Sequence, residues 1–324
     1  MGSEIGSFFK AKITKFVKSS EMFKSIRENV DVRRYEKLRE LATSYFPQYM
    51  EEIRGISEGS GVDFQDLVIL NFKYEYPLTS CSTIVFKIGN RIILGHNEDN
   101  DKENEENSFL IIARPRHGTP FISYCYPGMI PGNAFSFNSN GIIMTGNAMP
   151  TPDLRVGVPR HLIDRFVIEA PTIDDAVERA LFSRRASGFS YNLASLREKR
   201  VINLETTSQK HYLTEVNGRF FHTNHYVSSG LNNVKQRIGK SSLQRYRKGI
   251  ETINKIDEVS EQSVIETLSS AENKPYSIYA SGGRGSSWTL YTAIFNISDT
   301  ILLKIYARKE RKCDPLIFTT KIIE

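Results

Sequence analysis

Cysteine is scarce in this sequence, whose 324 residues hold only Cys81, Cys125 and Cys313. Three scattered cysteines are too few for a disulfide framework, and they lack the close spacing of a zinc site. No run of about 20 apolar residues is present either, which excludes a membrane-spanning helix. Residues 1–9 lack the basic start and apolar core of a secretory signal. These absences predict a reduced, cytoplasmic setting with no metal and no other cofactor.

A concentration of charge is also missing, although the formal net charge is +6. The densest basic runs, residues 10–18 and 304–312, are interpreted as solvated surfaces because no nucleic-acid motif accompanies them. We therefore expect no nucleic-acid partner. The composition, 40% hydrophobic and 25% charged, is that of a globular protein. Because the sequence has no internal repeat and no low-complexity linker, it predicts one compact domain.

The first part of the chain, residues 1–76, is predicted to be helical. Between residues 32 and 53, apolar side chains recur at spacings of three and four and form one stripe. Pro47 is expected to kink or split this stretch. Asp63 is the expected N-cap of a further helix, and Pro77 ends the helical part.

Strand patterns follow from residue 81 onward, interrupted by helices. An acidic, polar loop is expected over residues 98–107. Pairs of helices are expected at 159–181 and at 235–270. Hairpin turns are predicted at four places: Gly89-Asn90, Ser139-Asn140, Asn217-Gly218 and 296–299. Antiparallel hairpins with helices gathered between them predict an α+β fold of stacked layers rather than a doubly wound sheet.

The first hairpin carries the most chemical information. Residues 82–88 are rich in Thr, Ile, Val and Phe, Gly89-Asn90 breaks this run, and a second apolar run begins at residue 91. A strand–turn–strand unit brings its two ends together, so we expect Cys81 and Asp99 to lie close to each other. The alternative is a small buried cysteine that only begins a core strand.

A thiol at the start of a strand suggests a nucleophile at a chain end that cleavage creates. A free α-amine next to the thiol can accept its proton, because an α-amino group titrates near pH 8. No catalytic histidine is then required, and none of the six histidines forms a recognisable Cys–His motif. Asp99, eighteen residues after Cys81, would orient that amine or the thiol.

These residues resemble the isopenicillin N acyltransferase family of N-terminal nucleophile hydrolases. The resemblance begins with Cys81-Ser82-Thr83 and Gly95-His96-Asn97-Glu98-Asp99 and covers nearly the whole chain. Further similar segments are Phe137-Asn138-Ser139-Asn140-Gly141, Gly146-Asn147-Ala148, Gly157-Val158-Pro159, His222-Thr223-Asn224-His225, Pro275-Tyr276-Ser277-Ile278 and Thr289-Leu290. The resemblance implies a four-layer αββα sandwich with antiparallel sheets.

The resemblance also implies a precursor that cuts itself just before its nucleophilic cysteine. Here that bond is Ser80–Cys81, although the family often has glycine where Ser80 stands. Cleavage would give a helical segment, residues 1–80, packed on a catalytic domain, residues 81–324. The expected assembly is a heterodimer of the two fragments, and a homo-oligomer of such units stays open.

The roles of the site residues are carried over in the same way. Cys81 is the expected nucleophile, Asp99 the carboxylate that positions it, and Asn224 the oxyanion-hole side chain. Candidates for a further oxyanion or substrate-binding role are Asn147, His225 and Arg284. Each of these roles has an alternative, in which Asn147 and Asn224 are structural turn residues and His225 is a core residue. Arg284 is displaced from the Ser-Arg pair that the family carries before its Thr-Leu strand.

The sequence thus predicts an enzyme that hydrolyses or transfers an acyl group at a linear amide or thioester, through a Cys81 acyl-enzyme. Its expected partner is a small-molecule acyl amide or an acyl-coenzyme A-like substrate. Two other hypotheses remain at this point. One is a non-catalytic binding protein that kept the fold. The other is a Cys–His hydrolase that uses His222 or His225 without self-cleavage.

Overall fold

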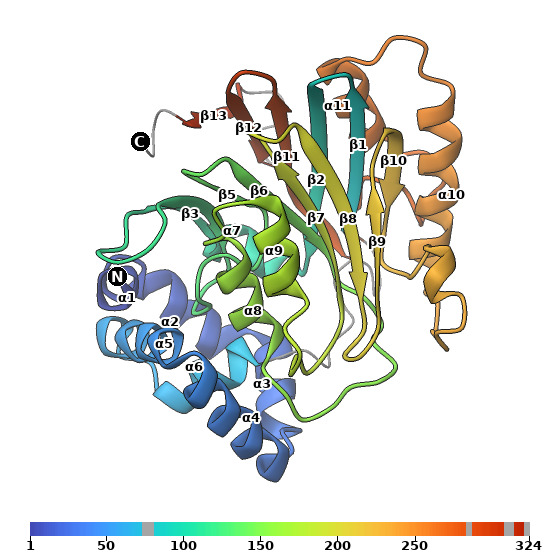
Figure 1. Cartoon of the computed structure of the whole chain (residues 1–324). Coiled ribbons are helices and arrows are strands. Elements are labelled where there is room, and N and C mark those ends of the chain that lie inside the picture. Colours follow the sequence, from blue (N-terminus) through green and yellow to red (C-terminus); the bar gives the residue numbers. More distant parts are fainter. Residues whose placement is uncertain (73–80, 283–286, 308–313, 321–324) are drawn as a thin grey trace.

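Two antiparallel sheets lie face to face between layers of helices (Figure 1). The computed structural model describes residues 1–72, 81–282, 287–307 and 314–320. The strands in these residues are β1 (Ser82–Ile88), β2 (Arg91–Asn100), β3 (Phe109–Ala113), β4 (Phe121–Cys125), β5 (Ser136–Asn138), β6 (Ile142–Asn147), β7 (Phe189–Ser195), β8 (Arg200–Thr206), β9 (His211–Glu215), β10 (Gly218–His222), β11 (Trp288–Ile297), β12 (Ile301–Ala307) and β13 (Leu316–Thr319).

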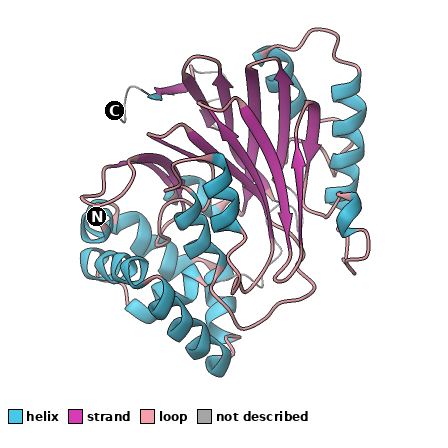
Figure 2. Ribbon diagram, viewed as in Figure 1, coloured by secondary structure: helices cyan, strands magenta, loops and turns pink. Residues whose placement is uncertain are grey.

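The helices form two groups along the chain, one before the first strand and one in the segments that connect later strands (Figure 2). The first group is α1 (Gly2–Phe8), α2 (Lys10–Ser19), α3 (Glu21–Glu28), α4 (Val32–Tyr45), α5 (Pro47–Ser60) and α6 (Phe64–Asn71). The second is α7 (Glu103–Asn107), α8 (Arg160–Val167), α9 (Ile173–Ala180), the 3₁₀ turn η1 (Ser229–Leu231), α10 (Lys240–Asn254) and α11 (Glu261–Ser269). Among the described residues, none of these helices is long and apolar enough to cross a membrane.

The strand order is β10-β1-β2-β11-β12-β13 in one sheet and β3-β4-β5-β6-β7-β8-β9 in the other. Side chains alternate along the central hairpin, as the period of a strand requires. Val85 and Leu94 point between the sheets and pack with Phe137, whereas Ile84 and Ile93 point outward to α10 and α11. The helices α8 and α9 cover the outer face of the other sheet. The predicted four-layer αββα sandwich is therefore confirmed.

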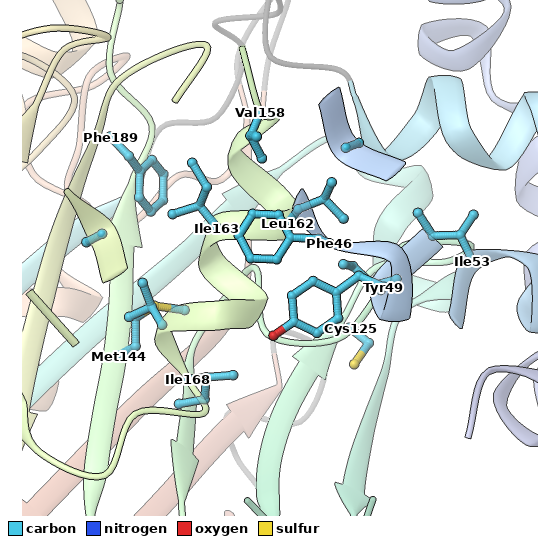
Figure 3. Close-up of a cluster of buried hydrophobic side chains, with 14 of the residues drawn as sticks. Phe46, Tyr49, Ile53, Cys125, Met144, Val158, Leu162, Ile163, Ile168 and Phe189 are labelled. Atoms are coloured by element: carbon cyan, nitrogen blue, oxygen red, sulfur yellow. The ribbon is translucent and has the colours of Figure 1, made fainter. Parts of the chain in front are cut away.

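The N-terminal helices share a core with the seven-stranded sheet and its helices. Phe46, Tyr49 and Ile53 belong to the same buried cluster as Leu162 of α8 and Cys125 of β4 (Figure 3). Pro47 splits the predicted stretch into α4 and α5, and it is the first residue of α5. Asp63 caps α6, as predicted, by accepting hydrogen bonds from two backbone N–H groups of its first turn.

Two local predictions are wrong. The segment 98–107 is not one loop, because β2 continues to Asn100 and α7 covers the rest. Asn217-Gly218 does not close a hairpin: β9 pairs with β8 in one sheet, and β10 pairs with β1 in the other. Gly218 has a φ of 96°, so it makes the tight turn that the sequence predicts. The strands on its two sides then separate, because each completes the edge of a different sheet.

Glycines allow α1 and α5 to pack with their backbones close together. A Cβ atom added at Gly59 would overlap with the backbone of Ser3 and Ser7, and one at Gly6 would overlap with the backbone of α5. Both obstacles are main chain, which cannot move aside as a flexible side chain does. The two helices therefore require glycine at this crossing.

We predict that Gly59→Ala destabilises the protein by about 1–3 kcal/mol, the usual cost of overpacking. Urea unfolding of the purified protein measures this change. Gly239→Ala is the matched control, because a Cβ atom there meets nothing within 4 Å. A Gly59→Ala variant as stable as this control would contradict the close packing of the two helices.

Candidate active site

The candidate site lies where the hairpin of β1 and β2 begins and ends. Cys81 directly precedes β1, and its side chain is buried. The pairing of Ser82 with Asn97 brings the end of β2 beside Cys81. A cavity of about 50 Å³ adjoins the cysteine, lined by polar groups that include Glu98 and by the aromatic ring of Phe189. The thiol thus faces a small space that is large enough for a reacting group.

The structure brings Asp99 to the cysteine, as the hairpin predicted. Asp99 is fully buried, and its backbone hydrogen-bonds the thiol. Burial raises the pKa of Cys81 well above its ordinary value, and the carboxylates of Glu98 and Asp99 raise this pKa further. The backbone hydrogen bond and the charge of Arg245 act in the opposite direction. In the continuous chain, the thiol is therefore protonated at neutral pH.

This electrostatic setting predicts how Cys81 reacts with iodoacetamide. Only the thiolate is alkylated, so the rate is expected to rise about tenfold per pH unit and to reach no plateau below pH 9. Glu98→Gln removes one of the two negative charges, which lowers the pKa of Cys81 and accelerates its alkylation at each pH. Mass-resolved labelling in a Cys125→Ala background measures the rate on the uncut chain, because the mass separates this chain from any cleaved protein. A plateau near neutral pH in the uncut protein would contradict the assigned pKa direction.

Asn224 is held in one orientation by Arg245, a buried residue of α10. The guanidinium donates from Nη2 to Asn224 Oδ1, at 2.8 Å. Because a guanidinium only donates, Oδ1 faces Arg245 and the amide NH₂ group faces the other way. One N–H of this group donates to the backbone oxygen of Ala148, at 3.0 Å, on the cavity wall. Among the described residues, the second N–H has no hydrogen-bond partner, so it is available to a ligand.

Arg245 also holds the cysteine itself. Its Nη1 donates to the backbone oxygen of Cys81 and to Ser82 Oγ, both at 2.8 Å. Sequence reasoning missed this residue because it described residues 235–256 only as a basic helical stretch and gave no role to any single arginine in it. The signal was the helical spacing of Ser242, Arg245, Gly249 and Ile253, which puts this arginine on the buried side of α10.

A hydrogen-bonded row of side chains runs from the second sheet to Glu98, which lies near the thiol. Thr83 Oγ1 donates to Asn147 Oδ1 and also contacts His96 Nδ1, each at 2.9 Å. His96 Nε2 lies 3.1 Å from Glu98 Oε2, and the Tyr126 hydroxyl donates to the other oxygen of Glu98. Sequence reasoning gave no roles to His96, Glu98 and Tyr126. The first two lie in the motif before Asp99, but only the hairpin register points them toward Cys81.

Asn147 is fully buried at the end of β6. Its Oδ1 accepts a second hydrogen bond from Asn192, at 2.9 Å. Its Nδ2 has no hydrogen-bond partner among the residues that the structure describes. A buried amide donor without a partner is rare and costly, so such a group is often kept for a ligand.

The two other histidines of interest support the loop that carries Asn224. His225 Nδ1 lies 2.8 Å from Ser242 Oγ, which in turn accepts from the backbone N–H of Asn224. Burial, with a smaller effect of His222, lowers the pKa of His225 to about 4, so this ring is neutral at pH 7. His222 Nε2 lies 2.8 Å from Glu205 Oε1. Ser80 and Arg284 lie outside the described residues.

One family model matches most of this chain, and curated relatives match parts of it. The model of the acyl-coenzyme A:6-aminopenicillanic acid acyl-transferase family matches residues 86–311. A β-alanyl-dopamine/carcinine hydrolase of Drosophila melanogaster is 31% identical over 154 residues, which are 40% of each chain. The 40 kDa form of an acyl-coenzyme A:6-aminopenicillanic-acid acyltransferase of Emericella nidulans is 28% identical over 197 residues, 58% of this chain and 54% of the relative. The matches thus span about half of these relatives, or less.

Similar solved structures are more distant in sequence. An N-acylethanolamine-hydrolyzing acid amidase orthologue of Caenorhabditis elegans is 15% identical, with a TM-score of 0.47, over 66% of this chain and 92% of the other. A mutant conjugated bile acid hydrolase of Clostridium perfringens is 12% identical, with a TM-score of 0.49, over 74% of this chain and 91% of the other.

Proposed function

Because the chain belongs to the acyl-coenzyme A:6-aminopenicillanic acid acyltransferase family, we propose that it is a self-processed cysteine enzyme acting on amide bonds. In this proposal, the Ser80–Cys81 bond is cut by the chain itself, and Cys81 then carries the acyl group of a linear amide or thioester. The observation that carries the proposal is the convergence, beside one cavity, of a thiol and an amide donor that the same arginine holds in place.

The reaction begins with the α-amine that cleavage creates at Cys81. This amine accepts the thiol proton, directly or through a water, so that the thiolate attacks the substrate carbonyl. The nearby carboxylates of Glu98 and Asp99 stabilise the ammonium group that results, just as they disfavour a thiolate in the uncut chain. After cleavage, the buried and protonated thiol therefore has a base beside it, the α-amine of Cys81.

The negative oxygen of the tetrahedral intermediate needs hydrogen-bond donors. The second N–H of Asn224 is oriented for this purpose, and Asn147 Nδ2 is a further donor for the oxyanion or the substrate. His225 supports the loop that carries Asn224. The leaving amine takes a proton, the acyl group stays on sulfur, and water or a second amine then releases it. Because water competes with any amine unless the site excludes it, hydrolysis is the expected default.

The space beside the thiol favours a short acyl group. The cavity of about 50 Å³ is narrowed by Phe189 and Met129. Since one relative is named a β-alanyl-dopamine/carcinine hydrolase, short β-aminoacyl amides are the first substrates to examine. Longer acyl chains form the comparison set.

The test is to trap the acyl-enzyme. Wild-type protein is mixed with acyl amides and acyl thioesters of increasing length, quenched in acid and weighed intact. We expect the mass of the fragment that begins at Cys81 to increase by that of the acyl group. Addition of an amine acceptor then distinguishes hydrolysis from acyl transfer. If no substrate acylates Cys81 or releases an amine, the non-catalytic binding hypothesis replaces the proposal.

The second candidate function is a Cys–His hydrolase. Its histidine would be His96, whereas the sequence indicated His222 or His225. His222 is bonded to Glu205 and His225 to Ser242, whereas ligand atoms of His96 and Cys81 lie within 4.8 Å of each other. This candidate predicts turnover by an uncut chain and its loss in His96→Asn. Turnover that appears only after cleavage excludes it.

A further inference from the structure

Three side chains with metal-ligating atoms come together beside the cavity, one from the residue before β1 and two from β2. Cys81, His96 and Glu98 are all buried, and one ligand atom of each lies within 4.8 Å of the others. In the described parts of the chain, this is the one cluster of at least three Cys, His, Asp or Glu side chains whose ligand atoms lie this close together. Sequence spacing does not reveal it, because the cysteine stands just before β1 and the other two ligands lie in β2.

The hydrogen bond with Thr83 determines which ring nitrogen of His96 faces Cys81 and Glu98. The Thr83 hydroxyl gives its single proton to Asn147 Oδ1, so it accepts the hydrogen bond from His96 Nδ1–H. A neutral His96 therefore points the lone pair of Nε2 at Glu98 Oε2, 3.1 Å away. Two lone pairs at this distance repel each other. The pair requires a proton or a metal cation between the two atoms.

His96 and Glu98 also have hydrogen bonds on the side away from the thiol, and bonds of this kind hold ligands in place at metal sites. Thr83 fixes the imidazole through its far nitrogen, and Tyr126 fixes the carboxylate of Glu98 through its far oxygen. Such outer partners orient metal ligands and set their tautomers. The near atoms, Nε2 and Oε2, remain directed to the same point beside the thiol. The thiolate would add a negative charge to those of Glu98 and Asp99, and Arg245 is a positive charge near it among the described residues.

We propose that Cys81, His96 and Glu98 form a binding site for Zn²⁺, and that the bound ion reversibly blocks the nucleophile. Sulfur and imidazole ligands favour zinc over magnesium or calcium. Zinc bonds of about 2.0–2.3 Å place tetrahedral ligands about 3.3–3.8 Å apart, so His96 Nε2 and Glu98 Oε2 would have to separate slightly from their present 3.1 Å. Cys81 and Glu98 also line the cavity, so a water there would supply the fourth ligand.

Binding is a proton exchange without a redox step. The S–H bond of Cys81 breaks, its proton leaves to solvent, and a zinc–sulfur bond forms with the same electron pair. A proton between His96 and Glu98 leaves in the same way. The thiolate is then a ligand and no longer a nucleophile. This inhibitory consequence rests on the proposed function, whereas zinc binding itself does not.

The first experiment measures metal binding without any substrate. Zinc is added to metal-free protein in competition with a chromophoric chelator, and Co²⁺ serves as a spectroscopic probe. We expect one zinc per chain in the wild type and in Cys125→Ala, and a thiolate-to-cobalt absorption band in both. Cys81→Ala is expected to lose the band, and Glu98→Gln to bind zinc more than about 100-fold more weakly.

A second variant separates a metal site from general damage to the fold. Thr83→Val keeps the shape of the side chain but removes the oxygen that bonds His96, so zinc affinity is expected to fall about 10–100-fold. Thermal unfolding checks that each variant folds, and added zinc is expected to raise the melting temperature of the wild type but not of Cys81→Ala. Equal zinc affinity in wild type and Cys81→Ala, or a cobalt complex without the thiolate band, would overturn the site.

Activity then distinguishes the two proposals. If the protein turns over acyl amides and binds no zinc, the zinc site is wrong and the proposed function stands. If zinc binds through Cys81 but no acyl-enzyme ever forms, the proposed function is wrong and the metal site stands. If both hold, zinc inhibits turnover at the concentration at which it binds, and a chelator restores the rate.

Discussion

Replacing Cys81 by alanine is expected to leave a single uncut chain that has lost on the order of 10⁶-fold in kcat, the cost of removing a catalytic nucleophile. The wild type is expected to give two fragments, residues 1–80 and 81–324. The physical reason is that one sulfur atom attacks twice in the proposal: first the peptide bond before it, then the substrate carbonyl. Intact mass and N-terminal sequencing follow the first event, and amine release follows the second.

Two further variants make this result interpretable. Cys125→Ala removes the other buried cysteine of the described chain and is expected to cleave itself and turn over like the wild type. Cys81→Ser keeps a weaker nucleophile and is expected to cleave slowly or stall. A Cys81→Ala protein that is still cut between residues 80 and 81 would show that another protease makes the cut, and the self-processing part of the proposal would be rejected.

Asn224→Ala is expected to lower kcat by about 10²–10³-fold with little change in KM, because the lost N–H stabilises the oxyanion rather than the bound substrate. Steady-state kinetics on cleaved protein measure both constants. The side chain also loses its hydrogen bonds to Ala148 and Arg245, so the melting temperature is recorded beside the rates. A rise in KM with an unchanged kcat would assign Asn224 to substrate binding instead.

Arg245→Met tests whether the arginine acts through Asn224. In the single variant, Asn224 is free to turn its amide away from the cavity, so kcat is expected to fall toward the value of Asn224→Ala. In the double variant Asn224→Ala/Arg245→Met, kcat is expected to be little lower than in Asn224→Ala alone, because the oriented donor is already lost. Arg247→Met is the matched control, since this arginine lies exposed on the same helix. Additive losses would instead give Arg245 an independent role at Cys81.

Local signals in the sequence predicted the elements of the fold well, but they did not predict how strands pair over long distances. Gly89-Asn90 closes a hairpin because both flanking strands belong to the same sheet. Asn217-Gly218 has equally strong turn chemistry, yet its flanking strands lie in different sheets. A turn specifies the reversal of the chain, whereas the partner of each strand depends on which edge is open in the folded molecule.

The same distinction applies to the site. Cys81 and Asp99 could be placed together from a single hairpin, and Asn224 from a motif. Arg245 was missed because its interactions join a helix to residues more than 160 positions earlier in the chain. A basic stretch is usually solvated, so only the tertiary structure shows that one of its charges is buried and holds two site residues.

The core that the N-terminal helices share with the second sheet has a consequence for how the protein can be made. Tyr49 bonds Glu169, and Glu52 forms an ion pair with Arg165, so the helical segment is tied to α8 by polar as well as apolar contacts. After a cut before Cys81, these contacts join two separate molecules. Refolding then becomes a bimolecular association that carries the entropy cost of bringing two chains together. A denatured, cleaved protein is expected to recover only at high concentration, whereas Cys81→Ala recovers at any dilution. The cut would thus make recovery of the folded protein depend on its concentration.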